Sequence, residues 1–251
     1  MALTAAPLAT RIDRHAAVRL RLIDGFQLVV DDLAVDAPLA AQRLVAFLAL
    51  HPRPLHRNYV AGALWLDKTD TRATSNLRSA LWRTRGYGER LIRSSRTHLG
   101  LADDVYVDVA EVDAVARKLL AGHAGDVAAD TKLLGGELLP DWYDDWVLIE
   151  RERLRQLCLH GLEQLSASWL ARGSVALAAD AAFAAVAAEP LRESAHRALV
   201  DAHLAAGNCG EAARQFKQYR ALLRNALGLE PSPAFRQQIA EVLGRQKVAR
   251  G

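Results

Sequence analysis

The sequence predicts an α+β N-terminal domain followed by an all-α domain. Three observations lead to this prediction: alternating strand-like residues from Val18, three helical segments followed by a polar hairpin, and helical periodicity throughout from Ala110. A chain of 251 residues can supply each domain with its own core. We therefore expect domains at residues 18–107 and 108–251. Residues 1–17 have little periodicity and are expected to form a flexible extension.

The first elements are expected to be three short strands. Val18, Leu20 and Leu22 alternate with charged or polar neighbours, which is the period-two pattern of a strand. Asp24-Gly25 and Asp31-Asp32 then supply the turns on either side of a second strand. These turns favour a small antiparallel sheet.

Three helices should follow. The first, from residue 39, ends at about residue 50, because the prolines of the next segment lack an amide donor and restrict the residues before them. The second covers about residues 57–66 and the third about residues 71–85, where Thr69 or Asp70 can cap the first amides. A hairpin with the polar tip Ser94–His98 and one further strand complete the domain. This element order is that of a winged helix-turn-helix.

The C-terminal domain contains an internal repeat. The segment Trp169 to Gly173 aligns with His203 to Gly207 at a spacing of 34 residues, which is the period of tetratricopeptide helix pairs. We expect a tetratricopeptide-like helical repeat, including a long helix over residues 145–171. The alternative is a chance similarity between two alanine-rich helical hairpins. The nearby Asp141, Asp144 and Asp145 are expected to form an acidic bend before the long helix rather than a metal site.

The positive charge is concentrated in one segment. The whole chain has a net charge of +3, but residues 68–96 contain eight lysines and arginines against Asp70 and Glu89. Such an excess is typical of a surface that binds phosphates. The alternative is a solvated helix face whose countercharges come from elsewhere in the fold.

The third helix has two different faces. At 100° per residue, Ala73, Leu77 and Ala80 fall on one side and form its packed face. The opposite side contains arginines, hydroxyls and an indole that can contact phosphates and base edges in a major groove. For Trp82 the alternative is packing beneath the hairpin, and for Arg85 and Arg90 we favour solvated side chains. The candidate DNA-binding residues on this helix are Arg72, Ser75, Arg78, Ser79, Trp82 and Arg83.

The hairpin tip supplies two more candidates. Arg93 and Arg96 could reach phosphates or an adjacent minor groove if the hairpin acts as a wing. The alternative is a solvated turn.

Other classes of function are disfavoured. We find no catalytic constellation, no glycine-rich phosphate loop and no metal-ligand spacing, so no catalytic residue, cofactor or metal is expected. Cys158 and Cys209 are far apart and are expected to be buried thiols. No apolar stretch is long enough to span a membrane, and the first residues do not form a secretory signal, which predicts a cytoplasmic protein.

Several motifs resemble those of one known family. From Val18 to about Leu243 the chain is similar to the small Streptomyces antibiotic regulatory proteins, which are bacterial transcription activators. The resemblance rests on residues 63–65, 76–83, 107–109, 136–141, Trp146, 150–155 and 230–233. The tip of the hairpin lacks the glycines found in many relatives.

The resemblance implies an OmpR-type winged helix and a bacterial transcriptional activation domain. It further implies a promoter-specific activator, of a secondary-metabolite gene cluster, that binds direct repeats of double-stranded DNA as a homodimer. RNA polymerase and its principal sigma factor are the implied partners, and the nucleoid is the implied location. One alternative is a tetratricopeptide-like interaction module whose winged domain does not bind specific DNA. Another is small-molecule sensing at a pocket lined by Trp142, Tyr143 and Trp146.

Overall fold

The computed structural model describes residues 17–87, 90–123 and 131–248. Apart from residue 17, the expected flexible extension lies outside the described residues. The chain divides into two compact units. The first contains the described residues up to Glu111 together with Leu138–Glu150, and the second contains Val112–Glu137 and the described residues from Arg151.

The first unit contains a four-stranded sheet in the order β3-β2-β1-β7. Its strands are β1 (Val18–Arg21), β2 (Gln27–Val30), β3 (Leu33–Val35) and β7 (Val105–Val107). The antiparallel pairing of β1, β2 and β3 is as predicted. Both residues of the Asp31-Asp32 turn have positive φ, as a type I′ hairpin turn requires.

The pairing of β7, which the sequence pattern leaves open, is parallel. This strand lies parallel to β1, with Val18 opposite Val105 and Leu20 opposite Val107. Parallel neighbours need a long crossover connection. In this chain that connection contains the three helices and the hairpin, which therefore lie between β1 and β7 in the sequence.

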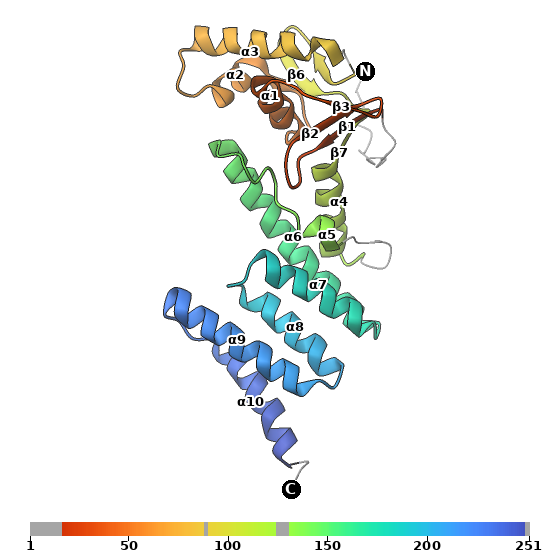
Figure 1. Cartoon of the computed structure of the whole chain (residues 1–251), viewed down its shortest axis with the longest axis vertical. Coiled ribbons are helices and arrows are strands. Elements are labelled where there is room, and N and C mark those ends of the chain that lie inside the picture. The colour runs from red at the N-terminus through yellow and green to blue at the C-terminus, as the bar shows by residue number, and fades with distance from the viewer. Residues whose placement is uncertain (1–16, 88–89, 124–130, 249–251) are drawn as a thin grey trace, which may run out of the picture. The chain divides into compact units, whose positions relative to one another are not determined.

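Three helices and a smaller sheet make up the rest of this unit (Figure 1). The predicted helix boundaries are correct to within about two residues. The sheet, of order β4-β6-β5, includes a two-residue strand that the sequence pattern did not predict. The elements are α1 (Leu39–Ala49), β4 (Leu55–His56), α2 (Arg57–Leu64), α3 (Asp70–Thr84), η1 (Arg85–Tyr87), β5 (Ile92–Ser94) and β6 (His98–Leu101).

The segment Leu138–Glu150 packs with the first unit. Its Leu138 forms a bridge with Ile23, and the amide of Leu139 donates to the carbonyl of Leu22 over 2.9 Å. Further along, Asp144 forms an ion pair with Arg43.

The remaining elements are helices. Those from α7 onward follow one another as neighbouring antiparallel layers of the second unit (Figure 1). Within the described residues, no helix is both long and apolar enough to cross a bilayer. The helices are α4 (Asp108–Leu120), α5 (Thr131–Leu134), α6 (Asp145–Ala171), α7 (Val175–Ala188), α8 (Glu193–Ala205), α9 (Cys209–Leu227) and α10 (Pro233–Val248).

The structure confirms the internal repeat of 34 residues. Gly173 and Gly207 both have a φ of +76°, a left-handed conformation that glycine adopts without a steric penalty. The amide of Ser174 donates to the carbonyl of Trp169, and the amide of Asn208 donates to that of His203, over 2.9 and 2.8 Å. The same helix-ending motif therefore recurs at positions 34 residues apart, and the helices that follow it, α7 and α9, begin at Val175 and Cys209, which have the same spacing.

The two cysteine thiols, Cys158 and Cys209, differ in burial. Cys158 is buried, and burial raises the pKa of its thiol to about 12, which keeps it protonated. Cys209, at the start of α9, is only half-buried, so the prediction of two buried thiols was wrong for this residue.

A buried histidine lies in the core of the second unit. The ring of His196 is 4.4 Å from that of Tyr219, between centroids. Its Nε2 lies 2.9 Å from the carbonyl oxygen of Pro190, and its Nδ1 lies 2.8 Å from Nε2 of Gln215. The neutral imidazole, which donates from Nε2 and accepts at Nδ1, satisfies both partners.

We predict that His196 makes the stability of the protein fall in mild acid. Burial lowers the pKa of this imidazole from its ordinary value of 6.5, against a smaller opposing effect of the Pro190 carbonyl. The unfolded chain therefore binds a proton at a higher pH than the folded chain. The free energy of unfolding should be at its full value above about pH 6.5 and should fall below it, by about 1.4 kcal/mol for each unit of pKa difference. Urea unfolding at about pH 7.5 and about pH 5.5 measures this fall.

The variant His196→Gln should show a smaller fall than the native chain. His160→Gln is the control, because His160 is exposed. An equal fall in all three proteins would contradict the prediction.

Candidate nucleic-acid interface

The exposed face of α3 contains every residue that the helical periodicity placed there. Its packed side is formed by Ala73, Leu77, Ala80 and Thr84, which are all buried. Trp82 is 69% exposed, so it does not pack beneath the hairpin. The predicted contact residues on this helix, all exposed, are Arg72, Ser75, Arg78, Ser79, Trp82 and Arg83.

The arginines on this face have no partner within the described part of the chain. No ion pair or hydrogen bond joins the guanidinium groups of Arg72, Arg78 and Arg83 to another described residue. The hydroxyl of Ser79 donates to the carbonyl oxygen of Ser75 over 3.1 Å, which leaves its oxygen able to accept. Thr69 is at the N-cap position of α3, but its side chain makes no capping hydrogen bond.

The tip of the hairpin that follows α3 contains no glycine and is held by hydrogen bonds of Ser95. Arg96 and Thr97 form its loop, and neither has a positive φ. The amide of Ser95 donates to the carbonyl of His98 over 2.9 Å. The Ser95 hydroxyl oxygen accepts from the amides of Thr97 and His98, at 3.3 and 2.9 Å. These hydrogen bonds explain how a tip without glycine forms a defined wing.

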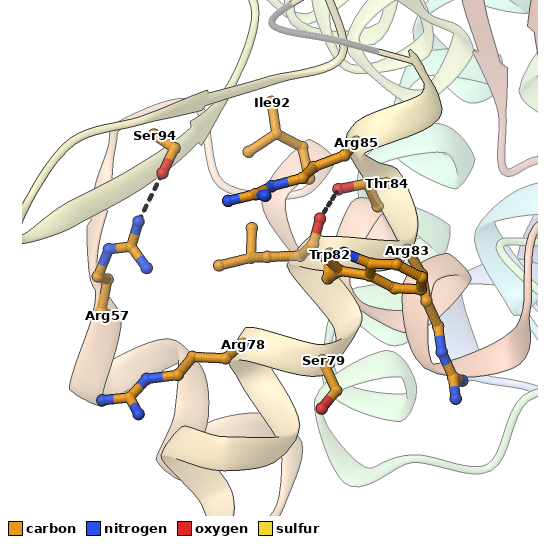
Figure 2. Close-up of a pocket in the computed structure, with 10 residues that line it drawn as sticks. Arg57, Arg78, Ser79, Trp82, Arg83, Thr84, Arg85, Ile92 and Ser94 are labelled. Atoms are coloured by element: carbon orange, nitrogen blue, oxygen red, sulfur yellow. Dashed lines mark hydrogen bonds between the residues drawn. The ribbon is translucent and has the colours of Figure 1, made fainter.

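Arg57 joins the wing to the start of α2, a contact that the sequence pattern did not predict. Its amide donates to the carbonyl of Thr97 over 2.9 Å, and its Nε donates to the carbonyl of Ser95 over 3.0 Å. A further hydrogen bond links its guanidinium to the hydroxyl of Ser94 (Figure 2). Arg57 lies outside the basic segment of residues 68–96, so charge density alone did not single it out.

The other arginines near the wing differ from one another. Arg93 is exposed but forms an ion pair with Asp103, in the turn after β6. Arg96 is exposed and has no partner among the described residues. Arg90 is exposed, as predicted for a solvated side chain, and it also donates two hydrogen bonds to Asp31, at 2.9 and 2.7 Å. These hydrogen bonds lower the pKa of the Asp31 carboxyl.

A hollow of about 880 Å³ lies between α3 and the wing. We call it the wing-side hollow. Its described lining includes Trp82 and Ile92, and Figure 2 shows the guanidinium groups of Arg57, Arg78 and Arg85 around one open space. The described lining contains no carboxylate: it consists of Arg57, Arg78, Ser79, Leu81, Trp82, Arg83, Thr84, Arg85, Ile92 and Ser94. An anionic chain is the chemical match for this surface.

The residues considered for other chemistry have structural roles. Asp144 pairs with Arg43, and the described residues contain no group of three or more residues suited to hold a metal ion. The ring of Trp142 stacks on Phe26, and that of Trp146 meets the edge of Phe47, with centroids 5.9 and 5.2 Å apart. By ring packing, these two tryptophans attach the segment Leu138–Glu150, which includes the start of α6, to the rest of the first unit.

A winged helix-turn-helix with an exposed basic face on its third helix is an architecture found in DNA-binding proteins, and here paired helices follow it. Residues 107–243, more than half of the chain, match the family model of the bacterial transcriptional activator domain. The chain belongs to this family. This match agrees with the bacterial transcriptional activation domain that the resemblance found in the sequence implies.

The fold is similar to that of a solved structure. That structure is of Mycobacterium tuberculosis EmbR in complex with low affinity phosphopeptide, and it matches with a TM-score of 0.69 at 19% sequence identity. The match covers 91% of this chain and 65% of the EmbR chain. At this identity the likeness shows the fold alone. A search of curated proteins found no match.

We predict that Arg57 holds the wing in place. Arg57→Ala removes both side-chain hydrogen bonds to Ser94 and Ser95, so amides of residues 91–101 should exchange with deuterium faster, while those of α3 change little. The expected loss of stability is about 0.5–1.5 kcal/mol, the net value of a typical hydrogen bond, because both hydrogen bonds lie at the exposed surface. Hydrogen exchange followed by mass spectrometry measures both regions.

Arg53→Ala is the matched control, because Arg53 is an exposed arginine in the same unit without a described partner. Equal exchange of the wing in the two variants would refute a positioning role for Arg57.

Proposed function

We propose that this protein activates transcription by binding specific double-stranded promoter DNA through α3 and the wing. The observation that carries this proposal is the exposed face of α3, whose three arginines have no described partner. Arginine can bond guanine through two hydrogen bonds in the major groove. The wing arginines then contact the sugar-phosphate backbone, with Arg96 freer to do so than the paired Arg93.

The proposal includes the partners implied by the family. The chain binds promoter direct repeats as a homodimer, in a secondary-metabolite gene cluster, and recruits RNA polymerase with its principal sigma factor. It acts in the cytoplasm, on the nucleoid. Membership of the bacterial transcriptional activator domain family supports the activating role. A coupling of a few kcal/mol between DNA-bound activator and polymerase is enough to raise promoter occupancy tenfold or more.

Selection of bound duplexes from a random pool tests this function, because the selection itself identifies the operator sequence. The expected result is an enriched motif repeated in the same orientation, bound in a mobility-shift assay despite excess nonspecific DNA. If the protein enriches no sequence but binds a peptide or protein partner, the interaction-module alternative replaces the proposal.

We predict that Arg78 and Arg96 affect binding in different ways. Arg78→Ala should weaken binding to the selected duplex by about 10- to 100-fold and binding to random duplex much less, because a two-bonded guanine contact is worth about 1–3 kcal/mol of discrimination. Arg96→Ala should weaken both about equally, because phosphate contacts carry no sequence information. Titrations of both duplexes at one salt concentration, with footprinting, measure these effects.

Arg172→Ala is the control, since this exposed arginine lies in the second unit, between α6 and α7. If Arg78→Ala weakens binding to selected and random duplexes equally, Arg78 does not read bases.

A further inference from the structure

A second hollow borders the other end of α3. It has a volume of about 350 Å³ and lies between α2 and the N-terminal half of α3. We call it the α2-side hollow. The wing-side hollow borders the C-terminal half of the same helix. Arg78 lines both hollows, so the two meet at the middle of α3.

The length of α3 relates these hollows to the two strands of a duplex. A helix of 15 residues is roughly 22 Å long, at about 1.5 Å per residue. The major groove is about 12 Å wide. A helix that lies across the groove therefore reaches both sugar-phosphate backbones, one near each of its ends, and this is the orientation in which the two hollows would face the two backbones.

The two hollows carry different charges. The described lining of the wing-side hollow contains four arginines and no carboxylate. The α2-side hollow contains one arginine, Arg78, and one carboxylate, Asp70, which offset each other. Its remaining hydrogen-bonding side chains are neutral: Asn58, Thr71 and Thr74.

Side chains with unused hydrogen-bonding capacity lie in both hollows. In the wing-side hollow, Arg85 is exposed and has no described partner. In the α2-side hollow, Asn58 and Thr71 are exposed, and within the described residues their side chains make no hydrogen bond. These residues were not among the contacts that the sequence predicts.

We infer that the two backbones of the bound duplex are held by different chemistry. The wing-side hollow binds one backbone through charge, with Arg85 as an additional phosphate contact beside Arg83. The α2-side hollow binds the other backbone through neutral hydrogen bonds from Asn58 and Thr71. This inference rests on the proposed function. It adds that the two ends of α3 contact the DNA backbone in different ways, one through charge and the other through neutral hydrogen bonds.

The dependence of affinity on salt separates the two kinds of contact. A cation that neutralises a phosphate releases a counterion, so the slope of log affinity against log salt changes by about 0.9 for each such contact in B-form DNA. A neutral hydrogen bond adds to affinity without releasing a counterion.

The experiment uses the full chain and a fluorescently labelled duplex, titrated by anisotropy at several salt concentrations. Arg85→Gln should make the slope less steep by about 0.9. Asn58→Ala and Thr71→Val should weaken binding severalfold at every salt concentration and leave the slope unchanged. Arg83→Gln provides a second test of the wing side, and Arg53→Gln is the charge control outside both hollows.

The outcomes distinguish the inference from the function on which it rests. If the native chain binds no duplex, the proposed function fails. If the native chain binds and Arg85→Gln leaves the slope unchanged, or Asn58→Ala changes the slope as much as Arg85→Gln does, the division between the hollows is wrong.

Discussion

The buried carboxylate of Asp108 determines how the first unit closes. Its oxygens accept hydrogen bonds from the amides of Leu22, Ile23 and Val109, at 2.8–3.0 Å. Burial raises the pKa of this carboxyl, while the three amides favour its charged form. The contact joins the residues after β1 to the first residue of α4. Since β7 lies parallel to β1, these hydrogen bonds close a loop of chain that contains all three helices and the wing.

This closure explains which parts of the fold could be predicted from the sequence. Helix boundaries and the buried face of α3 follow from local periodicity, and both were predicted well because Ala73, Leu77 and Ala80 recur at helical spacing. The parallel pairing of β7 depends on contacts between residues far apart in the chain. The strand β4 has only two residues, too few to show a period. The packing of Leu138–Glu150 with the first unit likewise depends on the distant partners Arg43 and Phe47.

In the candidate site, too, the features set by a single helix could be predicted, and the contacts between distant segments could not. Exposure of the arginines of α3 could be predicted because it follows from the geometry of one helix. The ion pair of Arg93 with Asp103, and that of Arg90 with Asp31, depend on how separate turns meet, which the sequence pattern does not contain. Arg57 was missed for this reason too, because its partners in the wing lie 37 and 38 residues away.

The carboxylates of the first unit determine where its positive charge remains. Asp32 pairs with Arg19, Asp31 with Arg90, and Asp103 with Arg93. Exposed pairs of this kind add little to stability, so their main consequence is electrostatic.

They neutralise arginines outside the α3 face and leave Arg72, Arg78 and Arg83 without described partners. The chain can therefore have a net charge of only +3 and still have a strong positive electrostatic field at the exposed face of α3. Such a field raises the rate at which a polyanion meets the surface, and under the proposed function it would orient the duplex before the side chains of α3 contact base edges.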